Sequence, residues 1–267
     1  MIVLETLVSH GSDFIEWIEG SGRSDAAARS IAAHGLDLVL SSAPKDLTVL
    51  HRRSSTVLLR RQPATLHQTL IGRPADAALL PPAVPAYAVA GDIVDSRRIY
   101  QPRRFSLQFG SAAGKKIKLY RSSAGTRYGQ AGGLFGTLRF APARPAAWAR
   151  LQLTVTPPLG RNLEFIAQAD ANGEFALAFD RLPLPTLDTA ATYQARLKVF
   201  ALNNTVDGMA PPPLNIDELP GARIATGKDG QQRSRFAAEL TFRVTPGVIR
   251  RLVSPEHADL LLAPGNP

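Results

Sequence analysis

Residues 163–179 read LEFIAQADANGEFALAF, two apolar-rich runs separated by the segment Asp170-Ala171-Asn172-Gly173. Glycine can adopt the positive φ that a tight turn requires, and an Asn-Gly pair between such runs is a strong hairpin signal. Phe175 and Leu177 are two residues apart, so they face the same side of the strand that follows. The stretch therefore predicts two β-strands joined by a tight turn.

The same period of two continues on both sides of this stretch. Runs that alternate apolar and polar residues between turn signals are 87–95, 103–110, 115–120, 135–141, 148–156, 192–202 and 235–244. Short alternating strands at this spacing are typical of antiparallel sandwiches and barrels. No helix-length periodic segment separates them, which argues against an α/β sheet. We predict a mainly β fold, an antiparallel β-sandwich of the immunoglobulin or transthyretin type.

The N-terminal part shows a different pattern. Phe14, Trp17 and Ile18 have the i, i+3, i+4 spacing of one helical face. Residues 24–34, SDAAARSIAAH, begin with a capping serine and precede Gly35, which favours a second short helix. We therefore expect a small helical N-terminal region, followed by one or two strands within residues 46–62.

Proline and glycine indicate where the chain divides. Residues 72–86 hold four prolines, which remove ladder donors and predict a connector. We expect an N-terminal region over 1–85, a β-sandwich region over 86–245 and a C-terminal tail over 246–267, in which residues 254–263 favour a terminal helical turn that begins at Ser254 and Pro255. Residues 203–232 contain three consecutive prolines and several glycines, and predict a long loop.

Composition is that of an ordinary soluble globular protein. The chain has 267 residues, of which 45% are hydrophobic and 20% charged, so bulk disorder is not expected. Cysteine is absent, which removes disulfides, thiolate metal sites and a cysteine nucleophile from consideration. Glu5 interrupts the first apolar run and no basic residue precedes it, so no Sec-type signal and no transmembrane segment are expected. The predicted location is the cytoplasm or an assembled particle.

The net charge of +9 is spread along the chain as arginines. A nucleic-acid-binding protein more often shows a basic helix or a known basic-aromatic motif, so nucleic acid is not the expected partner. Arginine and tyrosine are favoured at protein interfaces. The predicted interface residues are the arginine pair of the 103–110 strand, an Arg-Tyr pair in the loop 121–133, and the three prolines of the loop 209–220: Arg103, Arg104, Arg127, Tyr128, Pro211, Pro212 and Pro213.

Catalytic patterns are missing from the sequence. The five histidines, His10, His34, His51, His67 and His257, have no metal-binding spacing. Neither a G-x-S-x-G elbow nor a phosphate-binding P-loop occurs. Asp92 and Asp95 lie near a strand end and could join a dispersed acid-base site, although such residues are usually turn formers. We predict no enzyme activity, no catalytic residues, no metal and no cofactor.

Residues 132–202 resemble a carboxypeptidase regulatory-like domain, a small transthyretin-like β-sandwich. The resemblance is carried by the D-x-x-G-x-F pattern that runs from Asp170 to Phe175, and by Gly136, Leu138 and the Pro145-Ala146 pair before it. The family's usual role is that of a folding, spacer or recognition module without catalytic residues. More faintly, the arginine-rich strands at 88–110 and the glycine-rich segment 125–136 resemble components of phage-tail-like contractile injection systems.

These observations predict a structural or adaptor subunit of a larger assembly, for which a phage-tail-like contractile particle is the first candidate. The expected partners are protein subunits, with self-association as an option. The alternative is a free-standing β-sandwich module that binds carbohydrate or protein, because end loops of sandwiches often bind ligands. A hydrolase with a dispersed site is a third hypothesis.

Overall fold

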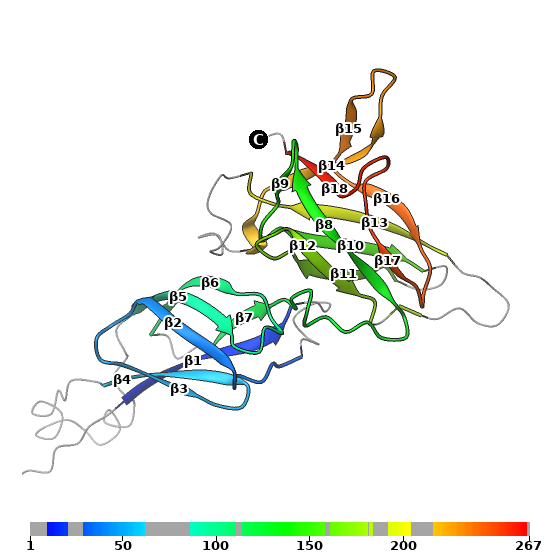
Figure 1. Cartoon of the computed structure of the whole chain (residues 1–267). Helices are drawn as coiled ribbons and strands as arrows, with labels where there is room; N and C mark the ends of the chain where they lie inside the picture. Colours follow the sequence, from blue (N-terminus) through cyan, green and yellow to red (C-terminus); the bar gives the residue numbers. More distant parts are fainter. Residues whose placement is uncertain are drawn as a thin grey trace, which may run out of the picture.

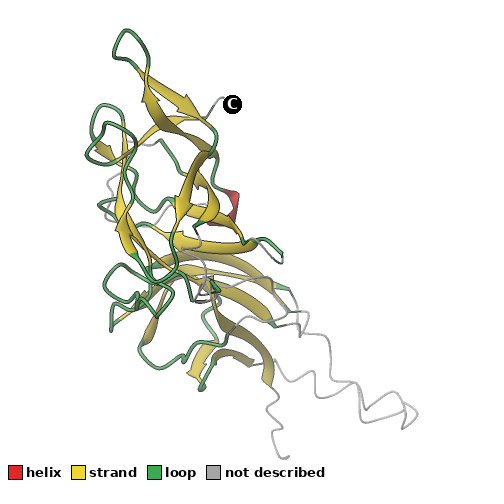
Figure 2. Ribbon diagram, turned by 90° about the vertical axis from the view of Figure 1, so that its right-hand side faces the viewer, coloured by secondary structure: helices red, strands yellow, loops and turns green. Residues whose placement is uncertain are grey.

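The computed structural model describes residues 10–20, 29–61, 86–110, 114–157, 161–180, 182–183, 192–203 and 216–265. Within these residues the chain is mainly β, as predicted, with three sheets and a single 3₁₀ turn, η3 (Ile216–Glu218), which is the red segment in Figure 2. Figure 1 shows two β units, one built from β1 to β7 and the other from β8 to β18. No helix in the described part of the chain is long and apolar enough to cross a membrane.

The strands of the N-terminal unit are β1 (His10–Glu19), β2 (Leu36–Ser42), β3 (Leu47–His51), β4 (Ser55–Arg61), β5 (Tyr87–Asp95), β6 (Arg103–Phe109) and β7 (Lys115–Leu119). The strands of the C-terminal unit are β8 (Gly133–Phe140), β9 (Arg144–Pro145), β10 (Arg150–Thr156), β11 (Leu163–Gln168), β12 (Glu174–Ala178), β13 (Tyr193–Phe200), β14 (Gly221–Lys228), β15 (Ser234–Ala237), β16 (Leu240–Val244), β17 (Ile249–Arg251) and β18 (Leu260–Pro264).

The N-terminal unit has two sheets that share one core. One sheet has the order β3-β4-β1-β7, with β1 and β7 parallel, and the other has the order β2-β5-β6. Ile15, Trp17 and Leu58 of the first sheet meet Val89 and Ile93 of the second in a single buried cluster. The core therefore extends from β1 to β7 and includes residues on both sides of the predicted connector at 72–86, most of which lies outside the described residues.

The predicted helix around Phe14, Trp17 and Ile18 is wrong, because these residues belong to β1. Asp13, Ile15 and Trp17 are buried and Phe14 is exposed, which is the period of two rather than of 3.6. Pairing with β4 and β7 on its two sides makes β1 a central strand. Residues 29–34 of the second predicted helix are not helical either, and the remainder of that segment lies outside the described residues.

The C-terminal unit has one curled sheet around a second core. The sheet follows the order β11-β10-β13-β14-β18-β8-β12, with β9, β15, β16 and β17 attached to this path. Leu138, Leu151, Leu197 and Leu262 come from four of these strands and are all buried in one cluster. Pairing is antiparallel except where β17 and β18 run parallel to β8.

The turn at residues 170–173 forms as predicted, although the strands that it joins are not ladder partners. Gly173 has a φ of +80°. The side-chain Oδ1 of Asp170 accepts hydrogen bonds from the backbone N–H groups of Asn172 at 2.8 Å and Glu174 at 2.9 Å. β11 pairs with β10, and β12 pairs with β8 at the other end of the sheet. The turn thus joins the two ends of the curled sheet rather than the strands of a two-stranded hairpin.

The segment 246–267, expected to be a tail, contributes β17 and β18 to the C-terminal unit. β18 lies between β14 and β8, and Leu260 and Leu262 are fully buried. The helical turn expected at residues 254–263 is absent, because residues 260–264 are a strand. The sheet built by residues 132–202 is consequently completed by strands from beyond residue 220.

Candidate interaction surfaces

One outer face of the C-terminal unit carries exposed apolar side chains. β17 runs beside β8 with Ile249 opposite Gly133 and Arg251 opposite Phe135. Side chains of paired residues point to the same face of a sheet. Phe135 is 41% exposed and Ile249 is 51% exposed. We call the group Tyr128, Phe135, Ile249 and Arg251 the β8–β17 face.

Tyr128 joins this face because it covers a glycine of β8. A Cβ on Gly133 would lie 2.6 Å from the Tyr128 ring, so the ring lies directly over that backbone. The Tyr128 hydroxyl donates a hydrogen bond to the carbonyl oxygen of Leu134 at 3.3 Å. Burial raises the pKa of Tyr128 above its usual value. The aromatic ring is thus held in place at the edge of the exposed apolar group, next to the exposed Arg127.

An ion-pair cluster fixes the arginine of the same face. The Nη2 of Arg251 lies 3.1 Å from the Oδ1 of Asp259, and the Nε of Arg139 lies 2.8 Å from the Oδ2 of that carboxylate. Arg139 is four residues along β8 from Phe135, so the two side chains point to the same face. Apolar side chains beside ordered arginines and a tyrosine have the composition of protein interfaces.

The second candidate surface is a cleft of about 340 Å3 beside β6, β7 and η3. Its lining is Arg103, Arg104, Phe105, Ser106, Leu107, Lys116, Ile117, Lys118, Asp217 and Glu218. Arg104 makes a two-point contact with Asp92, from Nε at 2.8 Å and from Nη2 at 3.1 Å. Both predicted arginines of β6 therefore reach this cleft.

Asp217 joins the two units at one end of that cleft. Its carboxylate lies 3.8 Å from the Nη2 of Arg103 and 3.4 Å from the Nη1 of Arg150, and it accepts a hydrogen bond from the Tyr120 hydroxyl at 3.4 Å. Burial lowers the pKa of Arg103 below its usual value. Tyr120 also packs with Ile216 and Leu219 in a small buried cluster. The two units therefore meet through an apolar contact with a shared carboxylate beside it.

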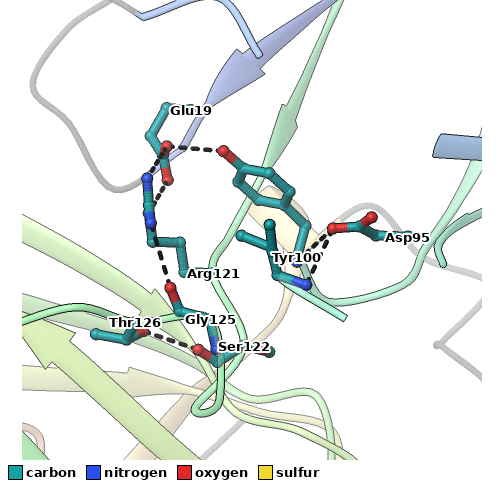
Figure 3. Close-up of polar contacts among 8 residues, drawn as sticks. Glu19, Asp95, Tyr100, Arg121, Ser122, Gly125 and Thr126 are labelled. Carbon is teal, nitrogen blue, oxygen red and sulfur yellow. Dashed lines mark hydrogen bonds and ion pairs between the residues drawn. The ribbon is translucent and has the colours of Figure 1, made fainter. Parts of the chain in front are cut away.

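A second polar network lies where the chain leaves the N-terminal unit (Figure 3). The guanidinium of Arg121 contacts both carboxylate oxygens of Glu19 at 3.1 Å and donates to the carbonyl oxygen of Gly125 at 3.2 Å. The Tyr100 hydroxyl donates to the same carboxylate at 3.1 Å. Asp95 accepts hydrogen bonds from the backbone N–H groups of Ile99 and Tyr100. The network fixes the end of β1 against the segment that leads to β8.

Buried tyrosines predict a loss of stability at alkaline pH. Burial and the Glu19 carboxylate raise the pKa of Tyr100 to about 12, and burial and nearby carboxylates raise the pKa values of Tyr87 and Tyr120. An unfolded tyrosine loses its proton near pH 10. Between about pH 10 and 12 the unfolded chain is deprotonated and the folded chain is not, so the stability present below pH 10 is lost as the pH rises.

We expect Tyr100→Phe to make the fall in unfolding free energy between about pH 10 and 11 shallower by about 1 kcal/mol per pH unit. Urea unfolding of the N-terminal unit, followed by the fluorescence of the buried Trp17, measures this slope. The absorbance of tyrosinate in the folded protein gives an independent measure of the deprotonation of the buried tyrosines. Equal slopes for the variant and the original protein would contradict the argument.

Several residues that the sequence analysis weighed for catalysis or metal binding have structural partners. Asp92 pairs with Arg104, and the buried Asp95 accepts the turn hydrogen bonds described above. His51 and His257 contact the hydroxyl groups of Thr56 and Ser234. Pro211, Pro212, Pro213 and His67 lie outside the described residues. No group of three His, Asp or Glu side chains within the described ranges is placed to hold a metal ion.

Comparison with known proteins yields no relative for this chain. No protein-family model, curated protein or solved structure matches it. Function must therefore be inferred from the two surfaces.

The sequence analysis named Arg103, Arg104 and Tyr128 as candidate interface residues, but it did not name Phe135 and Ile249. Phe135 belongs to a strand pattern that equally suits the core. The apolar group around it includes Ile249 of β17, which is more than a hundred residues away in sequence and lies in a segment with no clear alternation.

Proposed function

We propose that this protein is a non-enzymatic structural or adaptor subunit of a macromolecular assembly, and that the β8–β17 face contacts a neighbouring protein subunit. The observation that carries the proposal is the exposure of Phe135 and Ile249 on one outer face, beside Tyr128 and Arg251, which are held by a hydrogen bond and an ion pair. Contiguous exposed apolar patches on soluble proteins often mark interaction sites. Aromatic and arginine side chains supply most of the binding energy at such sites.

The assembly to test first is a phage-tail-like contractile injection particle. Support comes from the resemblance of residues 88–110 and 125–136 to components of such particles. The C-terminal unit is proposed to be a transthyretin-like module with additional strands, supported by its Asp170-to-Phe175 turn and by the sheet around it. In this proposal the protein works through surfaces on the outside of its sheets, rather than through a reactive pocket.

The double substitution Phe135→Glu and Ile249→Glu is expected to reduce incorporation into the assembly at least tenfold, which is about 1.4 kcal/mol. Each new carboxylate would lose water in the contact without gaining a partner. The variants should fold, because both side chains are exposed in the isolated protein. Gradient sedimentation of extracts from the native cells, with detection of the tagged chain, measures the high-mass fraction.

Val39→Glu and Leu50→Glu form the matched control, because they add the same charges at exposed apolar positions on strands of the N-terminal unit. This control should sediment with the original protein. Sedimentation of the original protein only as a monomer would exclude the assembly role and favour a free-standing binding module. Equal losses in both double variants would exclude the β8–β17 face as the contact.

A further inference from the structure

β12 extends the β8–β17 face by one strand, on the other side of β8. The rows that cross these three strands, read from β17 over β8 to β12, are Ile249, Gly133 and Ala178, and then Arg251, Phe135 and Ala176. Side chains of paired residues point to the same face of a sheet, so each row has a long side chain over β17 and an alanine over β12. One half of the face is therefore built from long side chains and the other half from short ones.

The middle of the face is aromatic. β8 is the central strand of the three, because β17 and β12 pair with its two sides. The exposed Phe135 projects from β8, and the Tyr128 ring lies over Gly133 one row away. Aromatic rings that meet across an interface contribute more than the area that they bury. The line of β8 is consequently where aromatic side chains of a partner bind best.

Charge is balanced on this face, although the chain as a whole has a net charge of +9. The charged side chains are Arg139, Arg251, Asp259 and Glu174 on the face and, just beyond its strands, the exposed Arg127 and Asp180. The remaining arginine of β17, Arg250, points to the opposite side of the sheet, because side chains alternate along a strand. A second copy of the chain can therefore approach this face without the repulsion that the net charge causes elsewhere.

We infer that the subunit that contacts the β8–β17 face is a second copy of this chain, packed face to face about a two-fold axis that runs along β8. The inference rests on the proposed function and deepens it by naming the partner. Such an axis places β17 of each copy over β12 of the other. Ile249 then packs over Ala178 of the second copy, and Arg251 lies beside Glu174 of the second copy. Long side chains thus oppose short ones, as close packing requires, and one patch serves both copies.

The dimer is expected to be weak, because three strands about 4.8 Å apart make a small interface. We expect a dissociation constant on the order of 10 µM. Sedimentation equilibrium of the purified full chain measures this constant. A chain that stays monomeric at about 100 µM would overturn the inference. It would leave the proposed function open, because the sedimentation of cell extracts would then report a neighbouring subunit of another kind.

An exchange of side-chain size tests the two-fold arrangement. Ala178→Ile should weaken the dimer at least tenfold, because the longer side chain meets Ile249 of the second copy. Adding Ile249→Ala to the same chain exchanges the two sizes and should restore the affinity to within about threefold. Ala88→Ile, at an exposed position of β5, is the matched control and should leave the dimer unchanged. Failure of the exchange to restore the dimer would contradict the packing of β17 over β12.

The absence of cysteine from the chain allows a second test that changes no contact residue. Thr137 lies on β8 two residues from Phe135, and packed sheets lie about 10 Å apart, so Thr137→Cys brings the two thiols within reach of a short bismaleimide. Crosslinked dimer should form readily from Thr137→Cys and hardly at all from Thr241→Cys, which is exposed on β16. Equal crosslinking of the two variants would overturn the inference.

Discussion

Replacing Phe175 by alanine should lower the free energy of unfolding of the C-terminal unit by about 3–5 kcal/mol while leaving the N-terminal unit unchanged. Phe175 is 2% exposed and belongs to the core of the C-terminal unit. Its ring lies against Gly136 of β8, where an added Cβ would be 3.1 Å from the ring. The β8 backbone at this point cannot fill the space that the ring leaves, so a cavity remains. The N-terminal core contains none of these residues.

The two tryptophans of the chain allow the units to be followed separately. Trp17 is buried in the N-terminal unit and Trp148 in the C-terminal unit. In a Trp17→Phe background, urea unfolding followed by Trp148 fluorescence should show the full loss for Phe175→Ala. Leu58→Ala, in the other core, is the matched control, and in a Trp148→Phe background it should shift the Trp17 signal instead. A common shift of both signals for either variant would show that the units unfold as one.

The sequence pattern predicted the mainly β class because the alternation of apolar and polar residues within a strand involves only residues that are close in sequence. It failed in β1, where Phe14, Trp17 and Ile18 fit a helical face by chance. The pattern that decides the structure is Asp13, Ile15 and Trp17, and it includes a buried carboxylate. Asp13 is buried because its Oδ2 accepts hydrogen bonds from the Tyr87 hydroxyl at 3.0 Å and the Gly110 N–H at 3.1 Å. Tyr87 and Gly110 are distant from Asp13 in sequence, so the sequence alone does not show that the Asp13 side chain points into the core.

Predicting the candidate surfaces met the same limit. Arg103, Arg104 and Tyr128 stood out because residue type alone marks them as interface residues. Whether these residues lie together depends on which strands form the edges of the sheets, and the sequence pattern does not show this. The cleft needs η3 to lie beside β6, more than a hundred residues earlier in the chain. The β8–β17 face needs the parallel pairing of β17 with β8, a contact that no local turn specifies.

Replacing Gly173 by glutamine should cost about 3 kcal/mol or more of the unfolding free energy of the C-terminal unit. A non-glycine residue at a φ of +80° costs about 1–2 kcal/mol. In addition, a Cβ at this position would lie 2.3 Å from the carbonyl oxygen of Leu138, which cannot move without disturbing β8. The Leu138 N–H also donates to the Gly173 carbonyl at 2.8 Å, so both strands would be displaced.

A second turn of the chain separates these two costs. Residues 229–233 repeat the hydrogen bonds of residues 170–174, since Asp229 Oδ1 accepts from the N–H groups of Gln231 and Arg233 at 2.9 and 2.8 Å. Its fourth residue is Gln232, at a φ of +60°. Glutamine is thus compatible with the turn itself when the turn projects into solvent between β14 and β15.

The reverse substitution, Gln232→Gly, should therefore change the unfolding free energy by less than about 1 kcal/mol, because relief of the positive φ is offset by added freedom in the unfolded chain. Trp148, whose backbone N–H donates to the Asp170 carbonyl at 3.0 Å, reports the unfolding of both variants in the Trp17→Phe background. Similar small effects for Gly173→Gln and Gln232→Gly would contradict the prediction, because they would show that the close approach of the Leu138 carbonyl adds no cost at residue 173. A large effect confined to Gly173→Gln would show that glycine is required at residue 173 because β8 approaches the turn closely. This approach is where the two ends of the curled sheet are joined.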